Sequence, residues 1–382
     1  MPLPKDIVHE IIDYLYEDHI SLISCSLVSR PFYRASRKHI FSSAYVDHES
    51  DVHALCSLLN KNPALAPFFR ILHVTLAHSR TLSHIPRVLP LLTQVRQLTL
   101  GKRGEPVILN RGDTITAIPP LLHLPRLEKI ELLWISNFPA TYLCIPLKIK
   151  TLEMEFVDIT MPARGNCLGV MAASRPMSLE SIHVDMMENL KKWPSLNAPK
   201  LRQLSIQRPG RGTQQIINAN AKSVRDVIWN NFDPRDCDVN FDIIYKLRRL
   251  SFVLLRPFAT RTPDVWTTIE NLWTFISDIL CTERVCRGLE ELNIAIKSHQ
   301  RGMSSVHNDK LVDVGTLWST LADKSRFPRL RRVTIFMEAE GCSTMITKEN
   351  LHAVVSKKLI LLEGAGLLHK KLCKHLHWHD FL

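Results

Sequence analysis

The sequence LRQLSI, residues 201–206, decides the fold of this chain. Its apolar residues Leu201, Leu204 and Ile206 have the spacing apolar-x-x-apolar-x-apolar. Because side chains alternate between the two faces of a strand, Leu204 and Ile206 lie on the same face. The segment therefore predicts a short β-strand with one buried side.

The same spacing recurs through most of the chain. It occurs as FRILHV (69–74), VRQLTL (95–100), LEKIEL (127–132), IKTLEM (149–154), LESIHV (179–184), LRQLSI (201–206), VRDVIW (224–229), LRRLSF (247–252), LEELNI (289–294) and LRRVTI (330–335). Successive starts lie 26, 32, 22, 30, 22, 23, 23, 42 and 41 residues apart. Such repeated strands are typical of a leucine-rich-repeat solenoid, in which they stack into a parallel sheet. The Asn that usually follows this motif is absent, so we expect irregular repeats.

Helical patterns fill the longer gaps between the motifs. The segment 262–280 has one apolar helical face, made of Trp266, Ile269, Trp273, Ile276 and Leu280. The segment 314–326 shows a similar pattern, and we expect a last helix over 347–376 that covers the end of the solenoid.

These patterns predict an α/β fold with a parallel concave sheet and helical convex segments. We expect a helical N-terminal domain at 1–42, an irregular solenoid at 43–346, and a helical cap with a basic His-rich tail at 347–382.

The fifth and seventh residues of each motif are expected to point away from the core, onto the concave face. Candidate substrate-binding residues at these positions are Glu131, Glu153, Glu155, Asp185, Gln207 and Asn230. Later positions are more apolar, for example Ile228, Val253 and Ala295. We expect a partner to bind where charged positions meet exposed apolar ones; alternatively, the long inserts cover the apolar positions.

Basic residues recur at the second position of the motif. They are Arg70, Arg96, Lys150, Arg202, Arg225, Arg248 and Arg331, and the chain has a net charge of +12. In a solenoid they would stack along the edge where the strands begin. This edge is either a solvated rim or a basic stripe for an acidic or phosphorylated partner. Nucleic acid is not an expected partner, because aromatic residues do not alternate with these positions.

The first 41 residues predict three short helices. Pro4 and Asp6 are residue types favoured at a helix start, and Ile7, Ile11 and Leu15 then recur every four residues. Three helices of this size cannot bury so much apolar surface by themselves. The surface must therefore contact either a partner or the next domain.

No motif indicates an enzyme. The chain has no GxxxxGK[ST], no GxGxxG and no GxSxG sequence, so we expect no catalytic residue and no cofactor. HEIID at 9–13 differs from the zinc-protease motif HExxH at its last residue, Asp13, and is expected to be a solvated helix face. The C-terminal residues His369, Cys373, His375, His377 and His379 could bind stray metal, but we expect no metal site there.

The cysteines indicate a reducing compartment. There are nine, an odd number, without CxxC spacing, and no signal peptide precedes Leu3. The longest charge-free stretch, 132–147, contains two prolines and is too short for a membrane span. We expect a cytoplasmic or nuclear protein with no membrane partner.

The N-terminal segment resembles an F-box, particularly that of F-box proteins from mushroom-type fungi. The matching features are Leu3-Pro4, the apolar helix from Ile7 to Leu15, Asp18, Ser21-Leu22, CSLVSR at 25–30, and Phe32 where many members have Trp. The solenoid beyond it is similar to members of that family only in architecture.

The resemblance implies that the three helices bind the Skp1 adaptor of a cullin–RING ubiquitin ligase, while the solenoid holds a protein substrate. It implies that Skp1 contacts are formed or supported by Leu3, Pro4, Ile7, Ile11, Leu22, Cys25, Leu27 and Val28.

Two other functions stay open. The chain could be an interaction scaffold whose N-terminal helices only cap the solenoid, or a hydrolase whose His residues bind a metal. Exposure of Ile7, Ile11 and Val28 favours the receptor, and their burial on the first repeat favours the scaffold.

Overall fold

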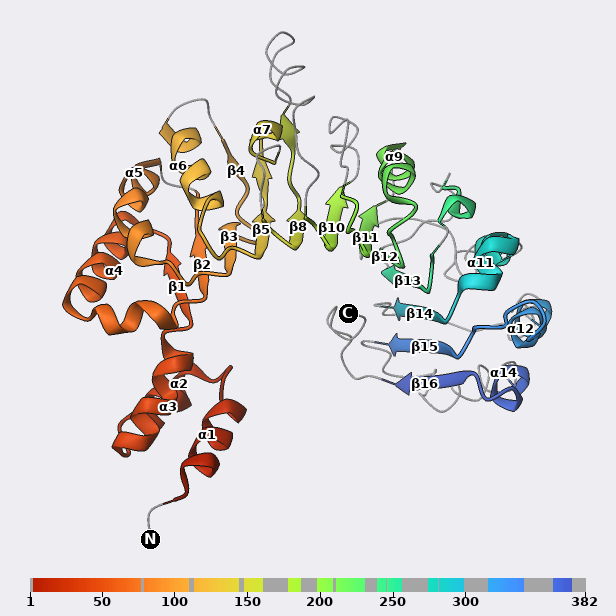
Figure 1. Ribbon diagram of the computed structural model, residues 1–382, viewed down its shortest axis with the longest axis horizontal. Helices are drawn as coiled ribbons and strands as arrows, with labels where there is room; N and C mark the ends of the chain where they lie inside the picture. Colours follow the sequence, from red (N-terminus) through yellow and green to blue (C-terminus); the bar gives the residue numbers. More distant parts are fainter. Residues whose placement is uncertain are drawn as a thin grey trace. The chain divides into compact units, whose positions relative to one another are not determined.

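The computed structural model describes residues 3–76, 79–109, 113–143, 148–160, 178–186, 198–208, 211–230, 239–244, 246–255, 274–280, 282–298, 315–339 and 360–372 (Figure 1). The chain divides into two compact units, Met1–Met177 and Ser178–Leu382, which are described separately.

Three helices begin the first unit, as the sequence predicts. They are α1 (Lys5–Tyr14), α2 (His19–Ser26) and α3 (Arg30–Ile40). Asp18 accepts a hydrogen bond from the backbone N–H of Ser21, 3.0 Å away, and so caps α2. A small core holds the helices together; its members are Val8, Ile12, Leu22 and Ala35, with Leu15, Cys25, Phe32 and Ile40 at its margin.

A parallel sheet follows in the first unit. Its described strands, in spatial order, are β1 (Ser43–Val46), β2 (Ile71–Val74), β3 (Gln97–Gly101), β5 (Lys129–Leu133) and β8 (Thr151–Glu155). The connecting helices are α4 (Glu49–Lys61), η1 (Pro63–Phe68), α5 (Ser79–Val88), η2 (Leu89–Leu91), α6 (Asp113–Leu122) and α7 (Ala140–Leu143). Figure 1 shows α4, α5 and α6 on one side of this sheet.

Two short parallel pairs add to the first unit. Strand β4 (Val107–Ile108) pairs with β6 (Ile135–Ser136), and β7 (Phe138–Pro139) pairs with β9 (Ile159–Thr160).

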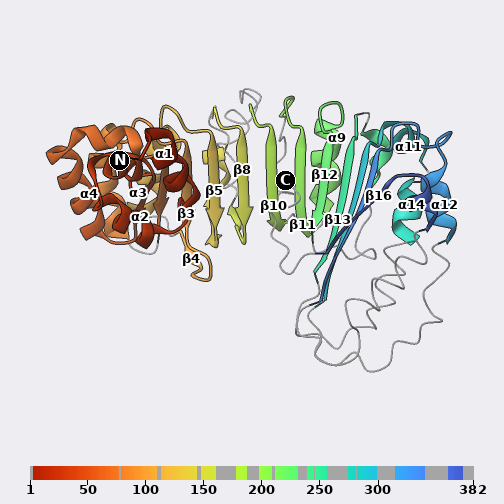
Figure 2. The ribbon, with the colours of Figure 1, turned by 90° about the horizontal axis from the view of Figure 1, so that it is seen from below.

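The second unit repeats the arrangement. Its described strands, again all parallel and in chain order, are β10 (Ser181–Met186), β11 (Gln203–Arg208), β12 (Asp226–Asn230), β13 (Arg249–Leu255), β14 (Glu291–Ser298), β15 (Arg332–Ala339) and β16 (Leu368–Leu372). The intervening elements include α9 (Arg211–Asn220), η5 (Phe241–Ile243), α11 (Glu283–Gly288), α12 (Gly315–Ala322) and α14 (Ile360–Gly364). Strands β10 to β13 lie side by side in Figure 2.

The motif explains the strands residue by residue. Each of the ten motifs lies within the described residues and forms a strand that begins at its third position. The first, fourth and sixth residues of every motif are buried, as in LRQLSI, where Leu201, Leu204 and Ile206 have no exposed surface. The fourth and sixth residues therefore face the helices. The third, fifth and seventh residues share the other side of the sheet, called here the odd-position face.

A row of backbone bonds joins the starts of the strands. Within each unit, the carbonyl at a motif's second position accepts two N–H groups from the next motif. The Arg70 carbonyl accepts from Arg96 at 2.8 Å and Gln97 at 3.0 Å, and the Arg202 carbonyl accepts from Arg225 at 2.8 Å and Asp226 at 2.9 Å. The second-position residues thus do stack along the edge where the strands begin.

The structure adds strands that the motif search missed and corrects one helix. Strands β1 and β16 were not predicted. Residues 368–372, expected within a helix over 347–376, pair with β15 as a strand, and only α14 is helical among the described residues of that segment. The expected helix at 314–326 is present as α12, and residues 274–280 are helical. Trp266, Ile269 and Trp273 lie outside the described residues.

None of the described helices could span a membrane. In that part of the chain, every helix is too short or too polar to cross a bilayer.

Gly101, at the end of β3, provides a test of the strand spacing. Its φ is +91°, and a Cβ atom there would lie 2.0 Å from the carbonyl oxygen of Leu133 on β5. Gly104 also has a positive φ, +81°, but a Cβ atom there meets nothing within 4 Å. We expect Gly104→Ala to cost about 1–2 kcal/mol, the strain of a left-handed backbone alone. Gly101→Ala should cost about 3 kcal/mol or more, because β3 and β5 must separate.

Urea unfolding followed by circular dichroism measures both costs. Equal destabilisation by the two variants would show that the close approach of β3 to β5 does not constrain the fold.

Candidate functional site

The helices α1–α3 expose a large apolar surface. On α1, Val8 and Ile12 are buried in the three-helix core, whereas Ile7, Ile11 and Tyr14 point to solvent with 42%, 38% and 88% of their surfaces exposed. The helix is therefore apolar on two sides. One side packs in the three-helix core, and the other is exposed to solvent. A contiguous apolar surface of this kind is typical of a protein-binding site.

Most of the residues expected to contact an adaptor are exposed. Leu3, Leu27 and Val28 are 54%, 82% and 70% exposed, and Pro4 is exposed as well. Cys25 is half-buried. Leu22 is completely buried in the core, so it can only support the surface from beneath.

The sequence prediction missed Ile20, Ile23, Tyr14 and Tyr16, which are also exposed. Ile23 directly follows the buried Leu22, and on a short helix with apolar residues on several sides the pattern does not separate the two roles.

The end of α3 attaches these helices to the sheet. The rings of Phe41 and Phe69 lie edge to face with centroids 6.1 Å apart. The Arg37 guanidinium lies over the rings of Tyr33 and Phe68, and the Ser42 carbonyl accepts the N–H groups of Arg70 and Ile71. These contacts leave the apolar sides of α1 and α2 uncovered, so the first repeat does not bury Ile7, Ile11 and Val28.

A second candidate surface is the odd-position face of the first unit. At its centre, Lys129 Nζ lies 2.8 Å from Glu131 Oε1 and 2.9 Å from Glu153 Oε1. Glu131 also accepts hydrogen bonds from Gln97 Nε2 at 2.9 Å and Thr99 Oγ1 at 2.8 Å. The cluster places two carboxylates and one ammonium group side by side on β3, β5 and β8, half-buried but open to solvent.

The two carboxylates differ in pKa. Burial opposes the ionisation of Glu131, but the bonds from Lys129 and Thr99 outweigh it and lower its pKa. Burial also dominates at Glu153, and together with the negative charge of Glu131 it raises the pKa of Glu153 despite the bond from Lys129. Glu131 is thus the stable anion of the pair, and Glu153 is the carboxyl group that takes up a proton more readily.

Aromatic and charged groups flank this cluster. On one side, the rings of Tyr45 and His73 stack with centroids 4.4 Å apart, and Tyr45 is 66% exposed. On the other side, the Glu155 carboxylate forms an ion pair with Arg103 Nε at 3.0 Å and accepts a hydrogen bond from Trp134 Nε1 at 3.4 Å. The predicted residues Glu131, Glu153 and Glu155 therefore lie together on one accessible face.

The odd-position face of the second unit is different, because most of its described side chains are buried. Asp185 and Asn230 are 0% and 1% exposed, and Gln207 is half-buried. Ile228, Val253 and Ala295 are buried as well, so the apolar residues expected to be exposed at that boundary are covered, as in the alternative stated above. The residues Asp185 and Asn230 do not offer a partner an accessible surface.

Several polar side chains on that face form hydrogen bonds with polar side chains of the neighbouring strands. Ser205 Oγ lies 2.7 Å from His183 Nδ1 and accepts from Asn230 Nδ2 at 3.2 Å. Asn293 Nδ2 donates to Ser251 Oγ at 3.1 Å. These groups stabilise the sheet by satisfying one another.

The row of basic second-position residues is interrupted by acids. Glu128 lies 3.3 Å from Lys150 and 3.9 Å from Arg96, and Glu290 lies 3.6 Å from Arg248. The edge therefore alternates in sign where these residues meet, as in a solvated rim with weak ion pairs.

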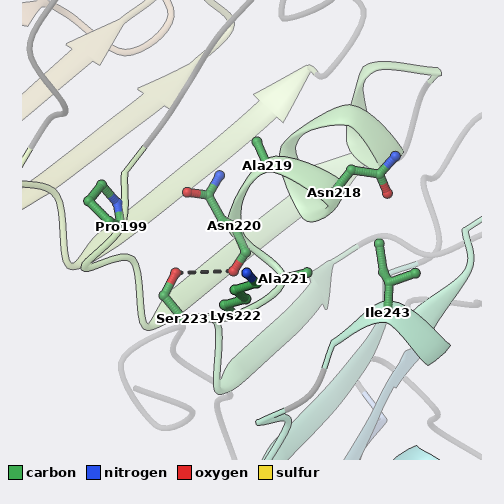
Figure 3. Close-up of a pocket in the computed structure, with 8 residues that line it drawn as sticks. All are labelled: Pro199, Asn218, Ala219, Asn220, Ala221, Lys222, Ser223 and Ile243. Carbon is green, nitrogen blue, oxygen red and sulfur yellow. Dashed lines mark hydrogen bonds between the residues drawn. The ribbon is translucent and has the colours of Figure 1, made fainter.

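A pocket of about 630 Å³ opens beside the end of α9 (Figure 3). Asn220, on its wall, accepts a hydrogen bond from the Ala198 N–H at 3.0 Å and donates to the Ile216 carbonyl at 2.9 Å. Ser223 Oγ donates to the Asn220 carbonyl. The polar groups of this pocket thus hold the turn after α9.

In HEIID, Asp13 pairs with residues of α3. Asp13 lies 2.6 Å from His39 Nε2 and 3.5 Å from Lys38 Nζ, which ties α1 to α3, and His9 is exposed. His369 lies in β16, whereas Cys373, His375, His377 and His379 lie outside the described residues.

Comparison with known proteins assigns no relative: no family model and no curated protein matches this sequence.

The acidic cluster leads to a prediction about pH and stability. The folded-state pKa of Glu131 lies below its ordinary value of 4.5, so its stabilising effect is present above that pH and is lost as the pH falls. The pKa of Glu153 is raised in the folded state. Its contribution to folding stability is therefore present at low pH, where the carboxyl group is protonated, and is lost as the pH rises. We expect Glu131→Gln to cost about 1–3 kcal/mol at pH 7 and less at pH 4, and Glu153→Gln to cost little at pH 7.

Urea unfolding of both variants at pH 7 and pH 4 checks this asymmetry. A greater loss from Glu153→Gln than from Glu131→Gln at pH 7 would reverse the assignment of the two carboxylates.

Proposed function

We propose that this chain is the substrate-recognition subunit of a ubiquitin ligase of the Skp1–cullin–F-box type. In this proposal α1–α3 bind the Skp1 adaptor, and the sheet-containing region binds a protein substrate. The single observation that supports it best is the exposed apolar side of α1 and α2, which the rest of the described chain leaves uncovered. The chain itself would position a substrate and catalyse nothing.

The exposed side chains would contribute a large part of the binding energy of such a complex. Fully burying an aliphatic side chain stabilises a complex by about 1.5–3 kcal/mol. Ile7, Ile11, Leu27 and Val28 are 42%, 38%, 82% and 70% exposed, so burying what is exposed would contribute roughly 3–7 kcal/mol, against an association cost of roughly 4–15 kcal/mol. Leu3, Ile20, Ile23 and Tyr14 are exposed as well and would add to the favourable side where a partner covers them.

Substrate binding is best assigned to the odd-position face of the first unit. Glu131, Glu153 and Glu155 lie on the same face as the exposed Tyr45 ring, a combination of hydrogen-bond acceptors and an aromatic contact surface. A substrate segment with basic or amide groups would complement it.

The alternative is a repeat scaffold whose N-terminal helices act as a cap. It is supported less well, because Val28 is 70% exposed and Ile7 is 42% exposed, whereas a cap covers its apolar side. A ligase subunit of this type would act in the cytoplasm or nucleus, as the cysteine content also suggests.

Binding to a purified Skp1 homologue tests the proposal. We expect the wild-type chain to form a complex that Ile11→Asp with Val28→Asp abolishes, because two carboxylates would be buried without partners. Ile108→Asp is the matched control: Ile108 is 62% exposed but lies on β4, away from α1–α3, so this variant should bind like the wild type.

Circular dichroism must show that all three proteins are folded. A well-folded wild type that does not bind Skp1, or a double variant that binds with unchanged affinity, would refute the receptor function and favour the scaffold.

A further inference from the structure

We propose that Glu49, His53 and His84 form a binding site for a divalent transition-metal ion of the zinc class. Glu49 and His53 lie one turn apart on α4, and His84 comes from the neighbouring helix α5. One ligand atom from each residue lies within 4.8 Å of the other two. This site is independent of the adaptor-binding surface on α1–α3.

The distances suit tetrahedral coordination. A metal ion bound at about 2.0–2.1 Å to nitrogen and oxygen ligands places those ligands about 3.3–3.5 Å apart. His53 Nε2 is 3.5 Å from Glu49 Oε1, which already matches. His84 Nε2 is 2.8 Å from the same oxygen, a hydrogen-bond distance, so metal binding would replace that bond after a shift of about half an ångström.

The orientation of His84 also favours a ligand role. Its ring is mostly buried and tilted 49° to the ring of His53, with centroids 5.1 Å apart. Its Nδ1 atom is enclosed without a hydrogen-bond partner, so Nε2 is the nitrogen directed at Glu49. Both imidazoles therefore direct Nε2 toward the same carboxylate.

The ligand set selects the class of metal. Two imidazoles and one carboxylate suit zinc and its neighbours, whereas calcium and magnesium prefer oxygen ligands alone. Asp51, in the same first turn, is not available, because its carboxylate accepts the N–H groups of Asp47 at 3.0 Å and His48 at 2.8 Å. Three protein ligands leave the fourth position to water.

Metal binding would tie α4 to α5 on the helical side of the first unit.

Titration of the full-length, metal-free chain with Co²⁺, followed by visible absorption and by displacement with Zn²⁺, tests the site. We expect the absorption of a tetrahedral cobalt centre and one ion bound per chain at this site. His53→Ala should weaken binding by about 100-fold or more, since even residues behind the ligands contribute 10–100-fold. His53 is 56% exposed, so its loss leaves the fold intact; Glu49→Gln and His84→Ala should act in the same direction.

Two controls separate this site from other histidines. His123→Ala removes an exposed histidine of the same unit and should leave binding unchanged. A chain with Ala at Cys373, His375, His377 and His379 should also keep the tetrahedral signal. Signal loss in that tail variant with retention in His53→Ala would overturn the proposal, and so would the absence of a tetrahedral signal in the folded wild type.

Discussion

The geometry of the sheets is set by second-position backbone carbonyls that each accept two N–H groups from the next motif. The Arg202 carbonyl, for example, receives the N–H groups of Arg225 and Asp226 and so fixes where β12 begins beside β11. Once the starts of the strands are aligned, every fourth and sixth residue meets its counterparts on the side of the helices. Alternation then leaves the third, fifth and seventh residues on the opposite face. The placement of both the core and the odd-position face follows from this one row of bonds.

Much of the fold could be predicted because each strand, with its row of backbone bonds, coincides with one copy of the apolar motif. Strand β1 carries the same spacing at Phe41, Ala44 and Val46 and could have been found by extending the search. Strand β16 could not, because Lys370 stands at the sixth position, where the motif has an apolar residue. There the pairing with β15 decides the conformation, and local sequence preference does not.

The exposed apolar surface of α1 and α2 was predictable only in part, for a physical reason. The pattern of α1 shows apolar residues on two sides, but burial inside the chain depends on where α2 and α3 pack. Leu22 and Leu27 belong to the same short apolar run, yet Leu22 completes the core and Leu27 is 82% exposed. Likewise, His53 and Glu49 are one helical turn apart in the sequence, whereas the approach of His84 depends on the packing of α5 against α4.

The two odd-position faces show how the same backbone can carry a buried polar network in one place and an accessible charged cluster in another. In the second unit the polar residues Ser205, Asn230, Ser251 and Asn293 are small and buried, and they bond across strands with one another. In the first unit Lys129, Glu131 and Glu153 are charged and remain in contact with solvent. These groups are only half-buried, so water still competes for part of their hydrogen bonding. A partner that excludes this water would strengthen each of these bonds, and this gain upon binding is why we propose the first unit as the place of substrate recognition.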